Sequence, residues 1–206
     1  MGVTFDKVKI PGGFPVFWRG EFKVLPGGFK LKQTFPEGTL LRKSIPLQLD
    51  FENMEAGVVK VAEILAGGTA TKPRVVKGSL LQVGDTVMVL GKTDASTTVK
   101  SLDKTSSEYD VIELTASLGA LAEKSFLQES SEYTAAAGEN PAVPAAPLYV
   151  ADAVIETDIE YSAKGFQTVS AGYEGLILKE VAYPIPSDWL NGYSLKGNPS
   201  IKYIRQ

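Results

Sequence analysis

The acidic residues of one predicted strand are the side chains best placed to do chemistry. Over residues 152–161, alternation puts Asp152, Glu156, Asp158 and Glu160 on one face and apolar residues on the other. Carboxylates are ligands that Ca²⁺ prefers. Residues two apart on a strand lie about 6–7 Å apart, however, too far for neighbours to share a cation without loop ligands. We therefore expect a solvated acidic face, with a cation site as the alternative.

The chain of 206 residues contains no His and no Cys. It therefore lacks the usual general base and the main ligands of zinc and iron. Nothing in the sequence identifies two of the carboxylates as a catalytic pair for glycoside hydrolysis. No Ser-x-x-Lys opens a predicted helix, no Gly-x-Ser-x-Gly elbow is present, and the Gly pairs lack P-loop spacing. We expect a protein that is not an enzyme, with no catalytic residue, cofactor or metal.

Aromatic and basic residues are concentrated in residues 1–46. The segment repeats Pro-Gly-Gly-Phe at 11–14 and 26–29 and carries eight Lys or Arg against three acids, a net +5. Such a segment either packs on its own domain or forms an arm that docks elsewhere, and its lack of long periodic runs favours the arm. The candidate partner-binding residues of this arm are Phe14, Phe17, Trp18, Arg19, Phe22 and Phe29.

The partner of this arm is expected to be a protein. Aromatic rings among basic residues can stack on single-stranded nucleic acid. The rest of the chain has a net charge of −8, which brings the whole chain to −3. This acidic balance disfavours a nucleic-acid partner. No apolar run approaches the ~18 residues that span a bilayer, and no signal peptide is recognisable at the start of the sequence. The absence of Cys fits folding in a reducing cytoplasm.

The elements that must position these residues are predicted to be mainly β. Short strands with Gly or Asp punctuation recur every 10–12 residues, a pattern typical of a small β-barrel or sandwich. They cover residues 57–65, 74–77, 86–90, 97–102 and 109–115, with later strands at 152–161, 175–182 and 200–204.

Two short helices and one loop complete the predicted β-rich domain, which covers residues 47–206. A helix is predicted over 117–127 and a single helical turn over 187–190. The Ala/Pro-rich residues 134–147 predict a loop, either an internal boundary or an extended excursion.

Residues 57–190 resemble the head fibre and head decoration proteins of tailed phages. The likeness rests on LLQVGDTVMVLGKTDASTTVKSLDKTSSEYDVIELTASLGALAEKSFLQESS at 80–131 and PLYVADAVIETDIEYSAKGFQTVSAGYEGLILKEVAYPIPSDWL at 147–190. It is a likeness of the order of strands, turns and acidic segments. The resemblance implies a structural capsid accessory protein with no catalytic residue.

Such a protein binds the outside of an assembled head, as a decoration or a fibre, and is made in the bacterial host cytoplasm. The expected partners are the major capsid protein and further copies of the same chain, with a homotrimer favoured. Two other readings stay open: a carbohydrate-binding β module, for which Trp18 and Trp189 are the candidate ring surfaces, and a cell-envelope adhesion domain.

Overall fold

A computed structural model describes residues 16–164 and 167–205 of the chain, without the side chains of residues 26 and 27. The fold is mainly β and contains barrels, which confirms the predicted fold class. Its strands are β1 (Trp18–Leu31), β2 (Leu40–Leu41), β3 (Pro46–Asp50), β4 (Glu55–Val58), β5 (Val61–Leu65), β6 (Arg74–Val76), β7 (Thr86–Val89), β8 (Thr97–Asp103), β9 (Tyr109–Leu114), β10 (Phe126–Glu129), β11 (Ala153–Ile155), β12 (Ile159–Glu160), β13 (Thr168–Leu178), β14 (Leu190–Asn191), β15 (Ser194–Leu195) and β16 (Ile201–Ile204).

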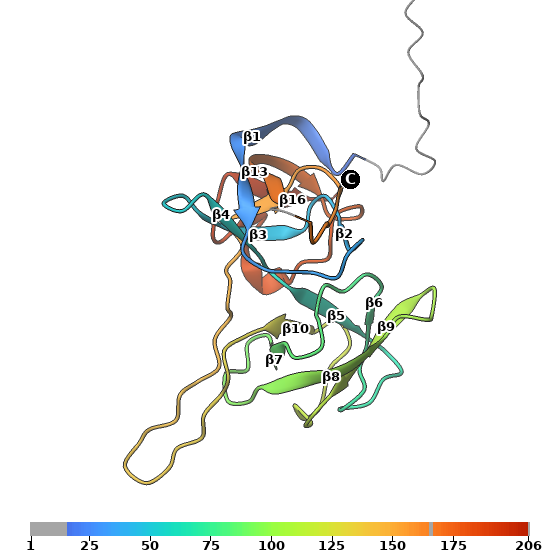
Figure 1. Ribbon diagram of the computed structural model, residues 1–206, viewed down its shortest axis with the longest axis vertical. Coiled ribbons are helices and arrows are strands. Elements are labelled where there is room, and N and C mark those ends of the chain that lie inside the picture. Colours follow the sequence, from blue (N-terminus) through green and yellow to red (C-terminus); the bar gives the residue numbers. More distant parts are fainter. Residues whose placement is uncertain (1–15, 165–166, 206) are drawn as a thin grey trace, which may run out of the picture.

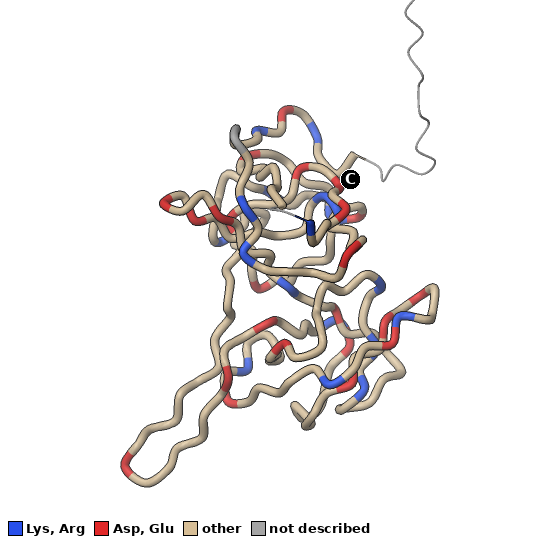
Figure 2. Tube along the Cα trace, in the orientation of Figure 1, with Lys and Arg blue, Asp and Glu red and all other residues tan. Residues whose placement is uncertain are grey.

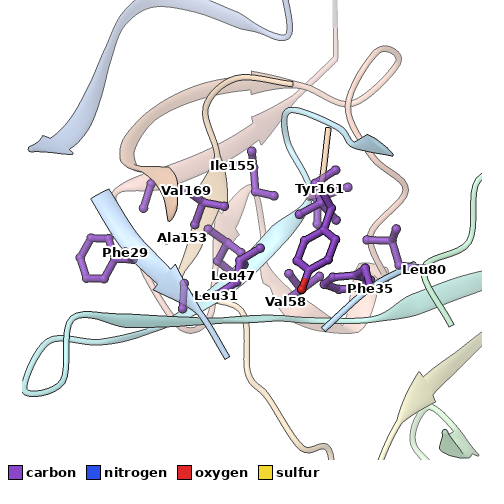
Figure 3. Close-up of a cluster of buried hydrophobic side chains, with 14 residues drawn as sticks. Phe29, Leu31, Phe35, Leu47, Val58, Leu80, Ala153, Ile155, Tyr161 and Val169 are labelled. Carbon is purple, nitrogen blue, oxygen red and sulfur yellow. The ribbon is translucent and has the colours of Figure 1, made fainter. Parts of the chain in front are cut away.

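Strands from both ends of the chain form a first barrel, which we call the terminal barrel. Its hydrogen-bonded order is β1-β4-β3-β11-β13, and β1 pairs with β13 as well as β4, which closes the ring. β16 pairs with the C-terminal half of β13, from Gly175 to Leu178, and β15 and β14 extend the sheet beyond β16. The 3-10 turn Ser187–Trp189 precedes this extension. Figure 3 shows the core of the terminal barrel, where Leu47, Ala153 and Ile155 lie close together.

The middle of the chain forms a second barrel, which we call the inserted barrel because it lies between β4 and β11 in the sequence (Figure 1). Its six strands close in the order β10-β5-β6-β9-β8-β7. Closure leaves no free strand edge, the usual route to edge-to-edge aggregation. Branched aliphatic residues such as Ile64, Val75, Val99 and Ile112 fill its interior.

A shared apolar cluster holds the two barrels together. Val61 and Phe126 of the inserted barrel pack in one cluster with Ile177 and Tyr203 of the terminal barrel. The Tyr183 hydroxyl donates a hydrogen bond of 2.8 Å to the carbonyl of Val61. The chain therefore forms two barrels joined by a continuous core. Among the described residues, no helix has the length and apolar character needed to cross a membrane.

The described part of the predicted N-terminal arm is built into the terminal barrel, which corrects the boundary at residue 46. β1 pairs with β13 from Trp18↔Ile177 to Lys30↔Thr168. Phe17 and Phe29 are fully buried. The Gly-Gly repeat at 27–28 falls at a register shift in β1, where Gly28 has a φ of 66°. That irregularity hides the strand pattern in the sequence. Residues 1–15 lie outside the described residues.

Two further predicted elements are wrong. The helix over 117–127 is absent, because Gly119 and Lys124 have positive φ and Phe126 begins β10, which closes the inserted barrel. The single strand over 152–161 is two strands in different sheets. β11 pairs with β3 and β13, whereas β12 pairs with β2. The three residues of β11 are all buried, since the shared cluster covers one side of the strand and the terminal-barrel core the other.

Candidate functional site

The predicted acidic face does not form a site in the structure. Asp152 accepts a hydrogen bond of 3.0 Å from the backbone N–H of Leu49, and Asp158 accepts one of 2.8 Å from the N–H of Lys43. These carboxylates therefore hold backbone segments. Burial raises the pKa of Asp152 to about 6. Within residues 16–164 and 167–205, no three acidic side chains gather closely enough to hold a metal ion.

The predicted partner-binding aromatics also pack on their own chain. Phe17, Trp18 and Phe22 form one cluster with ring centroids 4.9–5.3 Å apart. The Phe22 ring lies against Gly172 and Gly175 of β13, where a side chain would collide with it. Phe29 is in the barrel core, and of the described candidates Arg19 alone is exposed. Phe14 lies outside the described residues.

The most prominent surface feature is a long hairpin over residues 131–147, which we call the projecting hairpin. It leaves the inserted barrel after β10 and returns toward β11, and Figure 1 shows it extending well beyond both barrels. Its two limbs are paired at Ser130↔Pro147, Thr134↔Val143 and Ala137↔Asn140. Thr134 and Val143 exchange two backbone hydrogen bonds of 3.0 and 2.9 Å. The limbs are therefore held together at three separate bridges.

The base of the projecting hairpin is fixed to the inserted barrel. The N–H of Tyr133 donates to Ser96 Oγ at 2.7 Å, and the N–H of Ala145 donates to the Thr93 carbonyl at 2.9 Å. Ala145 is buried at this point. Every residue from 134 to 144 is exposed. The base therefore holds the tip away from the rest of the chain.

Small apolar residues dominate this exposed tip. Its sequence is TAAAGENPAVP over residues 134–144, and Val143 is 55% exposed. Figure 2 shows the projecting hairpin almost free of charge, apart from acidic residues. Fixing such a segment costs roughly 1–2 kcal/mol per residue in backbone entropy. The tip covers no core of its own chain, so only the backbone hydrogen bonds between its limbs offset this cost within the chain.

An apolar groove lies beside the base of the projecting hairpin, where the two barrels meet. Its volume is about 270 Å³. The residues that line it are Leu90, Gly91, Gln128, Pro147, Tyr149, Val150, Ala151, Asp188, Trp189, Leu195, Lys196 and Gly197. Gln128 is 1% exposed, and its Oε1 accepts no hydrogen bond from any residue that the structure describes. Val150, by contrast, is 57% exposed at this surface.

A buried ion group lies behind the groove, between the barrels. Lys60 connects β4 to β5, and its Nζ lies 2.8 Å from Asp85 Oδ2 and 2.9 Å from Glu129 Oε1. Burial raises the pKa of Glu129, and the positive charge of Lys60 opposes this shift. All three side chains are largely removed from solvent. With these paired charges, the group has a structural role in holding the junction.

The sequence signalled only part of this arrangement. The Ala/Pro composition of residues 134–147 indicated a loop or an excursion, and the structure makes it an ordered hairpin. The groove had no signal, because its walls come from four distant segments around residues 90, 128, 149 and 189. Comparisons with protein-family models, with curated proteins and with solved structures found no match.

Proposed function

We propose that this protein is a structural accessory protein of a tailed-phage head, bound to the outside of the assembled shell. The resemblance of residues 57–190 to head decoration and head fibre proteins supplies the class of particle. The partner in this proposal is the major capsid protein, and the location is the surface of the virion. The protein contributes binding surfaces rather than chemistry.

The projecting hairpin is the observation that carries this proposal. Its tip is exposed from residue 134 to residue 144 and is anchored at Tyr133 and Ala145. An ordered apolar arm of this kind is suited to contact between subunits, since exposed apolar segments mark interaction surfaces. The proposal requires that the arm contact another subunit of the assembled particle.

The surrounding architecture supports the same role. Both barrels are closed rings of strands, and a common apolar cluster fixes one against the other. A rigid body with a fixed arm can bind at repeated positions on a shell with little loss of entropy on binding. A decoration protein needs such pre-organised surfaces more than it needs a titrating imidazole or thiolate.

The test is head binding with and without the hairpin tip. Residues 135–142 are replaced by Asn-Gly, which closes a two-residue turn on the hydrogen-bonded pair Thr134 and Val143 and keeps both anchors. The intact chain is expected to co-sediment with phage heads at a saturable ratio, and the trimmed chain to lose most of this binding. Equal occupancy by both chains would show that head binding does not need the hairpin.

A further inference from the structure

Two exposed apolar features of this chain cannot meet within one molecule. The tip of the projecting hairpin extends away from the barrels (Figure 1), while the groove is lined by Pro147 at the base of the hairpin. The hydrogen bonds of Tyr133 to Ser96 and of Ala145 to Thr93 fix that direction. A hairpin that lies in such a groove must therefore come from a second copy of the chain.

The groove has the chemistry of a site for a proline-containing segment. Trp189, Tyr149 and Val150 give it aromatic and aliphatic walls. Aromatic-lined grooves bind extended proline-containing segments, because these are already ordered before binding.

The tip of the projecting hairpin has matching features. Pro141, Pro144 and Pro147 recur every third residue, the period of a polyproline helix, and the first two lie on the exposed limb. Ala142 and Val143 between them are small enough for a shallow groove.

The hairpin is acidic, whereas the groove lining is neutral overall. Residues 131–147 carry two acids, Glu132 and Glu139, and no Lys or Arg. The groove is lined by one basic and one acidic residue, Lys196 and Asp188. An acid introduced into the groove would therefore repel the acidic hairpin.

We propose that the projecting hairpin of one copy lies in the groove of a second copy. Each chain then gives one hairpin and accepts another, a heterologous contact that closes into a ring when the rotation between copies permits. Such a ring covers both the exposed tip and the apolar groove. The self-association is independent of the shell, so it is tested without phage heads.

The first test measures mass in solution by analytical ultracentrifugation. The intact chain is expected at two or more times its monomer mass of 22.1 kDa. The trimmed chain, with residues 135–142 replaced by Asn-Gly, is expected at the mass of its own monomer. Val150→Glu, which puts an acid in the groove against the acidic hairpin, is expected to weaken association at least tenfold. Val83→Glu is the matched control, since Val83 is 63% exposed and lies outside the groove.

The second test mixes the two defective variants. The trimmed chain keeps its groove, and Val150→Glu keeps its hairpin, so one productive contact remains between them. The mixture is expected to form a 1:1 dimer that neither variant forms alone. An intact chain that stays at 22.1 kDa, a trimmed chain that still assembles, or a mixture that stays monomeric would each overturn the inference. Head binding by a monomeric chain would overturn this inference alone, and assembly without head binding would overturn the proposed function alone.

Discussion

Lys60 Nζ donates a hydrogen bond of 2.9 Å to Glu129 Oε1, and this contact ties the segment that enters the inserted barrel to the strand that leaves it. Lys60 also donates to both oxygens of Asp85. The side chain of Lys60 is 3% exposed. The entry and the exit of the inserted barrel are therefore held by one buried cation.

Removal of this cation is expected to destabilise the protein strongly. Lys60→Met fills a similar volume but leaves Asp85 and Glu129 without their partner, and breaking a buried pair in this way costs about 3–5 kcal/mol. Chemical denaturation at neutral pH measures the loss. The loss is expected to shrink at acid pH, where Glu129 takes up a proton. Lys100→Met is the control, because Lys100 pairs with Glu113 on the exposed surface. Similar losses for both variants would contradict a structural role for the buried group.

Asp152 is expected to make stability fall as the pH rises. Its pKa in the folded protein is raised from 3.8 to about 6, so between these values the folded state binds more protons than the unfolded state. Asp152→Asn keeps an acceptor for the N–H of Leu49 and removes the charge. The variant is expected to match the parent below pH ~4 and to exceed its free energy of unfolding by about 1 kcal/mol above pH ~6, after allowance for partial exposure. Denaturation curves at pH ~4 and ~7 give the comparison, and a difference that does not change with pH would refute it.

The aromatics near the chain start are expected to act through stability rather than through docking. Phe17→Ala and Phe29→Ala each open a cavity in a fully buried site and are expected to cost about 3–5 kcal/mol. Arg19→Ala, at an exposed position of the same strand, is the matched control and should change stability little. Thermal unfolding reports the difference. If Phe17→Ala and Phe29→Ala unfolded at the same temperature as Arg19→Ala, the segment would not be part of the barrel core and would instead be a detached arm.

The close contact between Gly57 and Tyr149 gives a test of the groove wall. A methyl group at Gly57 would meet the ring of Tyr149, which lines the groove. Gly57→Ala is expected to cost about 1–3 kcal/mol through overpacking. In a Tyr149→Ala background the same change should cost much less, because the ring is gone. A double-mutant cycle by chemical denaturation measures this coupling, and additive losses would mean that the ring moves aside freely.

The local parts of the fold could be predicted from the sequence. Residues 86–90 form a short apolar run that follows the turn Gly84-Asp85, and residues 109–115 alternate, so the strands β7 and β9 match the prediction within one residue at each end. The alternation over residues 152–161 predicted one half-buried strand, but β11 covers only Ala153–Ile155 and is buried on both sides. β1 was missed since its register shifts interrupt any period.

The candidate site depends on contacts between distant residues, which a single sequence does not reveal. Gln128 and Trp189 line the same groove only because the inserted barrel, which lies between β4 and β11 in the sequence, packs against the terminal barrel. The composition of residues 134–147 showed an exposed segment but not its bridges or its anchors. Phe17 and Phe29 were predicted to be docking residues but are buried in the core. Aromatic residues are common both in cores and in interfaces, so their presence in the sequence does not distinguish the two.

Electron cryomicroscopy of phage heads tests the central claim most directly. Heads from a phage that encodes this chain are compared with heads from the same phage after deletion of its coding sequence. The proposal predicts extra density on the outer surface of the first shell, at repeated positions, into which the two barrels fit and from which a hairpin extends. Identical shells in the two samples, with the chain absent from the purified virion, would contradict it.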